Sequence, residues 1–267
     1  MHTQFKLILG GFIAAVAFFI LLSFKQTNST NASTKTINQS VPIPKEITIF
    51  DTTITLSRYD MRERFDREML QFVYQHSLTI TTLKRANNFF PIIEPILAKN
   101  GIPNDFKYLA LIESSFNIRS VSPAKAAGIW QLMPATAKEL GLEINDDVDE
   151  RYHIEKSTEA ACKYFKKAYD KFGDWFIVAA SYNAGMARLN SRTNKQQSTI
   201  AFDLLLPEET SRYLFRILAA KELLKDPQKY GFILKKEDLF HTVNFTEVTV
   251  DSTVTDWAEF AKQHEIT

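Results

Sequence analysis

Cysteine is almost absent from this chain of 267 residues, and neither sign of charge is in large excess. The single cysteine, Cys162, excludes an intramolecular disulfide, so the fold must be stabilised by packing. The formal net charge of +1 argues against the broad basic face that a nucleic-acid-binding protein needs. The length excludes a peptide hormone, a disulfide-stapled miniprotein and a multidomain array. Hydrophobic residues at 45% and charged residues at 24% are typical of a globular protein.

One long hydrophobic run is present, at the N-terminus. Residues 7–24 are 18 uncharged residues between Lys6 and Lys25, a length that nearly spans a bilayer as a helix. The short positive flank fits a cleaved signal peptide or an uncleaved anchor, and we favour the anchor because strongly apolar residues follow the small-residue stretch at 15–17. Residues 1–25 are therefore predicted to be a membrane anchor or signal segment. Residues 26–45, polar and rich in Thr, Ser and Asn, are predicted to be a flexible linker.

The rest of the chain reads as mostly helical. Apolar residues recur with a period near 3.6 residues, and Pro and Gly mark several boundaries. Segments 46–56 and 242–250 alternate apolar and β-branched residues, which predicts a small antiparallel ribbon that joins the ends of the domain. We therefore expect a catalytic domain at 46–230, with its core at 60–228, and a C-terminal extension of unknown role at 231–267. The predicted helices are 59–80, 83–99, 104–115, 134–140, 155–172, 174–187 and 208–225.

Glu113 is a candidate catalytic acid. At 100° per residue it shares one stripe of its predicted helix with Phe106, Leu109 and Ala110, so the carboxylate lies on the apolar face. Burial and the nearby helix C-terminus both disfavour its charged form and raise its pKa. A carboxyl group with a raised pKa is suited to general acid catalysis. The alternative from periodicity alone is a structural glutamate paired with a lysine or arginine.

Polar residues and a close-approach glycine follow Glu113. Gly128 precedes Ile129, Trp130 and Gln131, which together offer an aromatic platform and an amide. Downstream, Tyr182 and Asn183 follow a helix face of small residues that allows another backbone to come near. The alternative for Tyr182 is core packing through its ring.

These motifs, taken in order, resemble the soluble lytic transglycosylase family, particularly its membrane-bound type D branch. The resemblance covers about residues 60–228 and lacks the C-terminal cell-wall-binding repeats frequent in that branch. The matching stretches are Glu113-Ser114, Ser122-Pro123, Gly128-Ile129-Trp130-Gln131, Met133-Pro134-Ala135-Thr136, Ser157-Thr158-Glu159-Ala160-Ala161, Phe172-Gly173-Asp174-Trp175, Ser181-Tyr182-Asn183-Ala184-Gly185 and Glu209-Thr210-Ser211-Arg212-Tyr213.

The resemblance implies a mostly α, lysozyme-like domain that cleaves the β-1,4 bond between N-acetylmuramic acid and N-acetylglucosamine without water, leaving 1,6-anhydro ends. Glu113 would act first as the acid and then as the base. No metal or other cofactor is implied. The residues implied to bind substrate are Ser114, Ser122, Gln131, Tyr182, Asn183 and Tyr213.

Two alternatives stay open. A goose-type lysozyme-like hydrolase would need a second carboxylate to activate water, and Asp174 is not obviously placed for it. A non-catalytic peptidoglycan-binding scaffold would not need Glu113. For any of these, the expected partners are glycan strands and, through residues 7–24, a bacterial membrane on its periplasmic side; no nucleic acid is expected. The acidic residues Asp146, Asp147, Asp149 and Glu150 lack the glycine and final glutamate of an EF-hand, so we predict a solvated loop.

Overall fold

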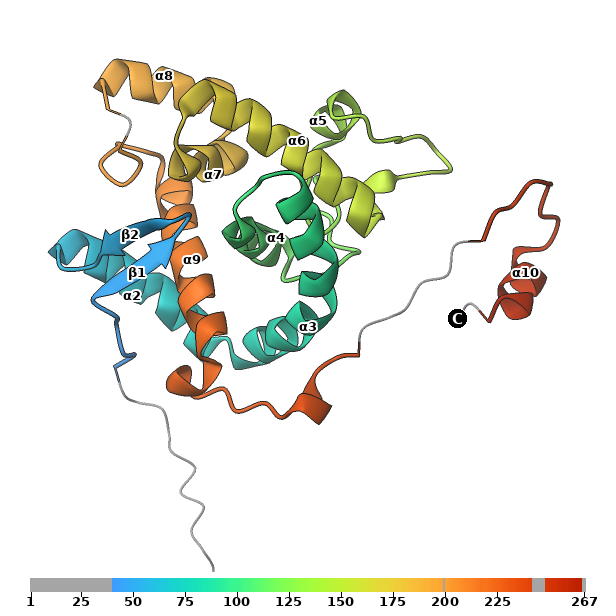
Figure 1. Ribbon diagram of the computed structural model, residues 1–267, viewed down its shortest axis with the longest axis horizontal. Helices are drawn as coiled ribbons and strands as arrows, with labels where there is room; N and C mark the ends of the chain where they lie inside the picture. The colour runs from blue at the N-terminus through green and yellow to red at the C-terminus, as the bar shows by residue number, and fades with distance from the viewer. Residues whose placement is uncertain (1–39, 199, 242–247, 266–267) are drawn as a thin grey trace, which may run out of the picture. The chain divides into compact units, whose positions relative to one another are not determined.

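The computed structural model describes residues 40–198, 200–241 and 248–265 (Figure 1). Helices dominate this part of the chain, as predicted. Among the described residues, no helix is long and apolar enough to cross a membrane. The predicted membrane segment at 7–24 and almost all of the predicted linker lie outside them. The helices are α2 (Tyr59–Tyr74), α3 (His76–Lys99), α4 (Lys107–Ser114), α5 (Pro134–Glu139), α6 (Ile154–Phe172), α7 (Trp175–Ala184), α8 (Met186–Gln196), α9 (Glu208–Lys225) and α10 (Trp257–Gln263).

The predicted β-ribbon is present but its pairing was wrong. Segment 46–56 folds back on itself as a hairpin of β1 (Glu46–Ile49) and β2 (Thr52–Thr55). The turn residues Phe50 and Asp51 both have positive φ, the geometry of a tight two-residue hairpin turn. Neither is a glycine or asparagine, and Asp51 is the one of the two whose residue type favours a turn. Residues 242–247 of the other predicted strand lie outside the described residues, and 248–250 are not in a strand.

Burial compensates for the strained hairpin turn. The Phe50 ring is only 4% exposed and lies 4.8 Å from the ring of Phe106. The Phe50 backbone N–H donates to Asp105 Oδ2 at 2.8 Å, and the same carboxylate also binds Lys221 of α9. The hairpin is thereby fixed to the start of α4 and to α9.

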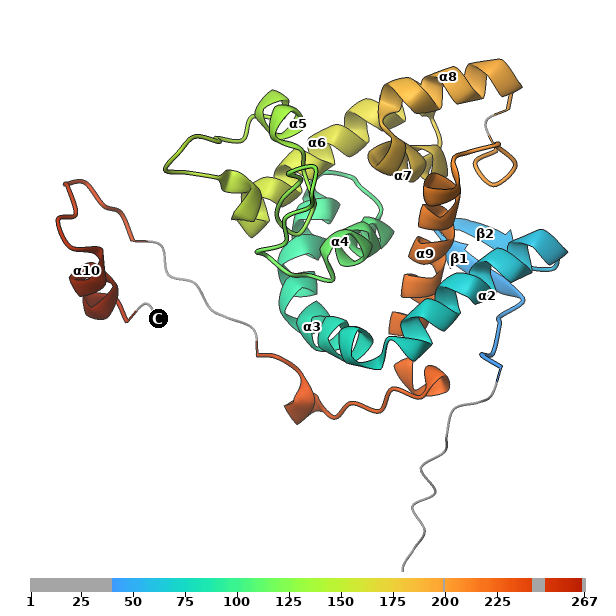
Figure 2. The same cartoon turned by 180° about the vertical axis from the view of Figure 1, so that it is seen from behind.

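Helix α7 lies at the centre of the core. Val178, Ala179 and Ala180 are fully buried, and α7 packs against α6 on one side and α9 on another. Figures 1 and 2 show α9 running past α2, α4 and α7. Small side chains on α7 allow these helices to approach closely, as the sequence predicted. Helix α9 therefore brings its residues next to α4, which carries Glu113.

Several helix boundaries differ from those predicted. The first break falls at Gln75 rather than near residue 81, and the predicted helix at 174–187 divides at Gly185 into α7 and α8. Gly185 has a φ of 86°, which a glycine adopts without strain. Helix α8 was not predicted, because its sequence is mostly polar and only Leu189 is buried.

Candidate active site

Glu113 lies in the last turn of the short helix α4. Ser115 and Phe116, which follow, both have positive φ and turn the chain sharply away from the helix. The turn is held from both sides, because Arg85 Nη1 donates to the Ser115 carbonyl at 3.0 Å and the buried Phe116 ring stacks on Phe89 at 5.1 Å. The catalytic candidate is thus at a rigid helix end.

The Glu113 carboxylate is partly buried and accepts a hydrogen bond from another helix. Tyr213 Oη, on α9, donates to Glu113 Oε1 at 2.7 Å, and the Tyr213 side chain is itself buried. No lysine or arginine of the described chain lies within ion-pair distance, 4.0 Å, of this carboxylate. The alternative of a glutamate locked in a structural ion pair is therefore not supported.

Burial dominates the protonation of Glu113. Desolvation raises its pKa from 4.5 to about 7, against the opposing effects of the Tyr213 hydrogen bond and the positive charge of Arg216. The negative charge of Glu209 adds slightly to the increase. The sequence-based expectation of a raised pKa is confirmed in direction and in its main cause. A carboxyl group with this pKa can give up a proton and take one back near neutral pH.

A loop at residues 120–132 lies against the end of α4 and is fixed by one arginine. The Arg151 side chain donates to the carbonyls of Lys125 and Leu132 at 2.7 and 3.1 Å. Gly128, with φ +78°, passes so close to this segment that a Cβ atom would lie 2.0 Å from the Arg151 carbonyl oxygen. The close approach predicted for Gly128 is thus confirmed. Only glycine fits at this position.

Two of the predicted site residues brace the same loop. Ser114 Oγ donates towards the carbonyls of Ala110 and Ile129, at 3.1 and 3.0 Å. Tyr182 Oη donates to the carbonyl of Trp130 at 2.7 Å. Burial and the nearby Glu113 charge raise the pKa of Tyr182, so its hydroxyl stays a donor. Consecutive carbonyls of the loop are therefore tied to α4 and to α7.

The other predicted site residues keep polar atoms available. Gln131 Nε2 donates to the carbonyls of Ser120 and Gly128, and its amide oxygen has no hydrogen bond within the described chain. Asn183 Oδ1 accepts from Thr210 Oγ1 at 2.9 Å, which orients its NH₂ group as a free donor. Ser122 Oγ accepts from the Ala126 backbone N–H and keeps its own proton to donate. All three residues are partly buried.

Two hollows open beside these residues. One, of about 210 Å³, has in its wall Ile112, which precedes Glu113 on α4, and Ser115, which caps the end of that helix. The other, of about 580 Å³, is lined by Gly185 and Met186 at the end of α7 and by Tyr164, whose ring contacts that of Tyr182 at 5.1 Å. Neither hollow is lined by Glu113 or by the predicted substrate-binding residues themselves.

Three contributors were missed from the sequence. Arg151 holds the loop, Thr210 orients Asn183, and Arg216 acts electrostatically on Glu113. The solvated-loop prediction for the acidic cluster was wrong for Asp149, which binds Arg151 at 2.6 Å. Asp149 caps the short 3-10 helix Glu150–Tyr152, where its Oδ1 also accepts from the Arg151 backbone N–H at 3.1 Å.

Known proteins resemble the chain over this region. Residues 90–204 match the family model of the transglycosylase SLT domain. Membrane-bound lytic murein transglycosylase D of Escherichia coli K12 is 33% identical over 183 residues, which are 67% of this chain and 40% of that protein. Peptidoglycan transglycosylase gp16 of Escherichia phage T7 is 33% identical over 122 residues, 45% of this chain and 9% of that protein. The 70 kDa soluble lytic transglycosylase of Escherichia coli aligns with a TM-score of 0.48 at 18% identity, over 64% of this chain and 31% of that one.

The chain thus spans less than half the length of these curated relatives. Within that span, the matched domain contains Glu113, the loop at 120–132 and the Tyr182-Asn183 pair, and the mostly helical architecture is the one predicted for it. On this domain match, residues 90–204 of the chain form a domain of the soluble lytic transglycosylase family.

Proposed function

We propose that this protein is a lytic transglycosylase that cleaves the MurNAc-GlcNAc β-1,4 bond of peptidoglycan and leaves 1,6-anhydroMurNAc ends. The observation that carries the proposal is a partly buried Glu113 whose pKa is about 7 and whose hydrogen-bond partner is a tyrosine. A single carboxyl group that titrates near neutral pH can serve both proton transfers of a non-hydrolytic cleavage. Family membership supports the same chemistry.

In the first step, protonated Glu113 gives its proton to the glycosidic oxygen as the bond from C1 breaks. Electron density from the acetamide oxygen of the same sugar stabilises the positive charge that develops at C1. In the second step, the Glu113 carboxylate removes the proton from the C6 hydroxyl, whose oxygen attacks C1 and closes the anhydro ring. Tyr213 holds the carboxylate in place through both transfers. No water is consumed, and the acid is regenerated protonated.

The free polar atoms around Glu113 would hold the sugars. The Ser122 hydroxyl and the Gln131 amide oxygen come from the braced loop, and the Asn183 amide nitrogen comes from α7. Ser114 and Tyr182 act through the loop, because their hydroxyls already bind its carbonyls. We thus assign sugar contacts to the first three side chains and a positioning role to Ser114. The ring of Tyr182 packs against the rings of Tyr164 and Phe165, with centroids 5.1 and 5.3 Å away.

A hydrolase would need a second carboxylate that lies about 5–9.5 Å from the first and attacks the sugar or activates water. Asp174 is engaged as the N-cap of α7, where Oδ1 accepts from the Ile177 backbone N–H at 2.8 Å. Glu209 acts on Glu113 only through its charge and is exposed at the start of α9. The engagement of Asp174 and the match to a transglycosylase domain support transglycosylation over hydrolysis.

Mass spectrometry of the sugars released from purified sacculi in H₂¹⁸O tests the proposal. We expect anhydro ends without ¹⁸O from the wild type and no release from Glu113→Gln. Glu63→Gln, an exposed carboxyl on α2, serves as the matched control and should release as much as the wild type. Reducing ends that carry ¹⁸O would instead show a hydrolase. Equal release by Glu113→Gln would refute the role of Glu113.

Substrate location gives the expected compartment. Peptidoglycan lies outside the cytoplasmic membrane, so we propose that the catalytic domain at 46–230 acts on the periplasmic side, tethered by residues 7–24. Fractionation of cells that express the full chain should place it in the membrane fraction and accessible to an externally added protease. Recovery in the soluble fraction after cleavage near residue 17 would show a signal peptide instead.

A further inference from the structure

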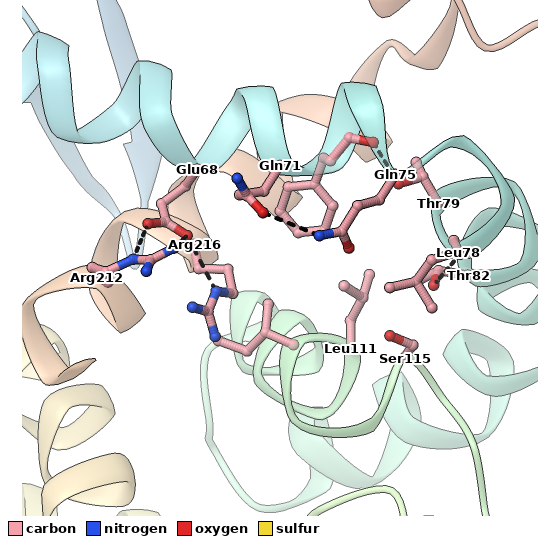
Figure 3. A pocket seen from close by; sticks show the side chains of 12 residues that line it. Glu68, Gln71, Gln75, Leu78, Thr79, Thr82, Leu111, Ser115, Arg212 and Arg216 are labelled. Carbon is pink, nitrogen blue, oxygen red and sulfur yellow. Dashed lines mark hydrogen bonds and ion pairs between the residues drawn. The ribbon is translucent and has the colours of Figure 1, made fainter.

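Glu68, on α2, is a buried carboxylate that the proposed mechanism does not use. Its side chain is 0% exposed, and an ionised carboxylate is costly to bury unless cations pair with it. Three arginines do so, with their Nε atoms 2.6 to 3.4 Å from the Glu68 oxygens: Arg212, Arg216 and Arg67. Figure 3 shows Glu68 with Arg212 and Arg216 at one end of the hollow of about 210 Å³. Glu68 thereby holds two side chains of α9, the helix that also carries Tyr213.

Arg216 lies where two faces of α9 meet. Arg212 and Arg216 are four positions apart and therefore share the face that meets Glu68. Tyr213 and Arg216 are three positions apart and share the face that meets α4, where Tyr213 Oη donates to Glu113 Oε1 at 2.7 Å. The Arg216 guanidinium is therefore placed between the buried carboxylate of α2 and the catalytic carboxyl of α4.

Arg216 is only partly engaged by Glu68. Its Nε donates to the Glu68 carboxylate at 3.3 Å, while its terminal nitrogens form no hydrogen bond within the described chain. The side chain is 35% exposed and shares the wall of the hollow with Ile112, the residue before Glu113. Among the residues that the structure describes, Glu113 Oε2 has no hydrogen-bond donor either. A guanidinium released by Glu68 therefore has an available carboxylate partner on α4.

An ion pair between Arg216 and Glu113 would prevent general acid catalysis. An opposite charge within about 4–6 Å lowers the pKa of a carboxyl by about 1–3, which would leave Glu113 ionised at neutral pH. No such pair exists among the described residues, and Arg216 lowers the pKa of Glu113 less than burial raises it. The other charged or titratable groups near Glu113 are Tyr213 and Glu209 on α9, Tyr182 on α7 and Arg85 on α3. Because Arg85 already donates to the Ser115 carbonyl, the position of Arg216 controls the protonation of Glu113.

We propose that Glu68 is a positioning residue that holds Arg216 out of ion-pair contact with Glu113, so that the catalytic acid stays protonated until it meets the glycosidic oxygen. After the first proton transfer, the positive charge of Arg216 favours the carboxylate that has formed. The inference rests on the proposed function, since it concerns the proton transfers of Glu113. It adds to the reaction a residue of α2, outside the matched domain at 90–204.

The pH–rate profile of the full chain on purified sacculi tests the inference. In Glu68→Gln, Arg216 turns to Glu113, so the basic limb should move from about pH 7 to about pH 6 or below. The rate should fall about tenfold at pH 8 and less than about twofold at pH 5, because only the protonated acid starts the reaction. In the double variant Glu68→Gln/Arg216→Gln this downward movement should be absent, since the cation is gone. Arg212→Gln, the matched control, breaks the shorter contact of Glu68, at 2.6 Å, and should leave the limb in place.

Three results overturn the inference while the proposed function stands. One is a basic limb that stays in place in Glu68→Gln. The others are an equal downward movement in the double variant, which would act without Arg216, or in Arg212→Gln, which would follow from any break in the buried cluster. If Glu68→Gln does not fold, Glu68→Asp replaces it, because the shorter side chain keeps the buried charge but draws back from Arg216, and the same direction is expected.

An NMR titration of ¹³C-labelled glutamate side chains separates the inference from the proposed function. It measures the pKa of the Glu113 carboxyl without substrate, and Glu113→Gln identifies the signal. We expect this pKa to fall from about 7 to about 6 or below in Glu68→Gln, and not in the double variant. If the wild type releases no sugars from sacculi, the proposed function fails and the titration decides. A Glu113 pKa that Glu68→Gln leaves unchanged, or that falls equally in the double variant, overturns the inference.

Discussion

Replacing Glu113 by glutamine should make the folded protein more stable while abolishing cleavage. The glutamine can keep its side-chain oxygen at the position that accepts from Tyr213 Oη at 2.7 Å. It removes the ionisable group that burial disfavours. Stability and catalysis therefore make opposite demands on this position.

The magnitude depends on pH in a defined way. Below pH 4.5 the carboxyl is protonated in both the folded and the unfolded chain, so it contributes nothing to the pH dependence. Between pH 4.5 and about 7 the unfolded chain ionises it and the folded chain does not, so the free energy of unfolding of the wild type falls as pH rises. Above about pH 7 the loss is complete. The change from 4.5 to about 7 sets an upper limit of about 3 kcal/mol, and partial exposure reduces the expected value to about 1–2 kcal/mol.

Urea unfolding at pH 4, 6 and 8 measures this effect. We expect the difference in unfolding free energy between Glu113→Gln and the wild type to increase by about 1–2 kcal/mol from pH 4 to pH 8. Glu63→Gln, at an exposed position, should show a difference that hardly varies with pH. A Glu113→Gln difference that is equally flat would refute the desolvated carboxyl, and with it the acid role that depends on a raised pKa.

Three further substitutions test other parts of the structure. Gly128→Ala should destabilise the fold by more than about 3 kcal/mol in thermal unfolding, because the new Cβ would lie 2.0 Å from a carbonyl oxygen. The control Gly173→Ala, with φ +67° and no atom within 4 Å of the new Cβ, should lower the unfolding free energy by only about 1 kcal/mol. Equal losses in the two variants would contradict the close approach at Gly128. Tyr213→Phe removes a hydrogen bond that lowers the pKa of the Glu113 carboxyl, so the basic limb of the pH–rate profile should move upward from about pH 7. We expect kcat to fall about tenfold. A basic limb that stays in place would show that the hydrogen bond is not formed in solution. Asp51→Gly should raise the unfolding free energy by about 0.5 kcal/mol, because φ is 57° there, and a loss on urea unfolding would contradict the turn geometry.

The hydrophobic periodicity of the sequence was sufficient to predict most of the helices and the apolar environment of Glu113. The apolar stripe on α4 follows directly from spacing, so burial of the carboxylate and the direction of its pKa shift could be predicted. Gly128 likewise predicted a close approach of another backbone segment, and in the structure that segment is the backbone at Arg151. These features are local, and local sequence contains their causes.

Long-range pairs could not be predicted from spacing. Tyr213 is 100 positions from Glu113, and its place beside the carboxylate depends on how α9 crosses α4. Its role was predicted only from the family resemblance. Arg216 and Glu68 are separated by 148 positions and were not singled out. The hairpin at 46–55 was misread because Phe50 takes a left-handed conformation that its residue type disfavours. Its burial against Phe106 compensates, and that contact is visible only in the fold.

The hydrogen bond from Tyr213 on α9 to the Glu113 carboxylate has a practical consequence for shortened versions of this protein. The match to the family model stops at residue 204, nine positions short of Tyr213, whose hydroxyl donates to the Glu113 carboxylate. A fragment cut at the borders of this match would keep the acid yet lose the helix that orients it. A shortened version therefore has to keep α9, and the buried Val41, Tyr230 and Phe232 place its ends outside the segment from Glu46 to Lys225.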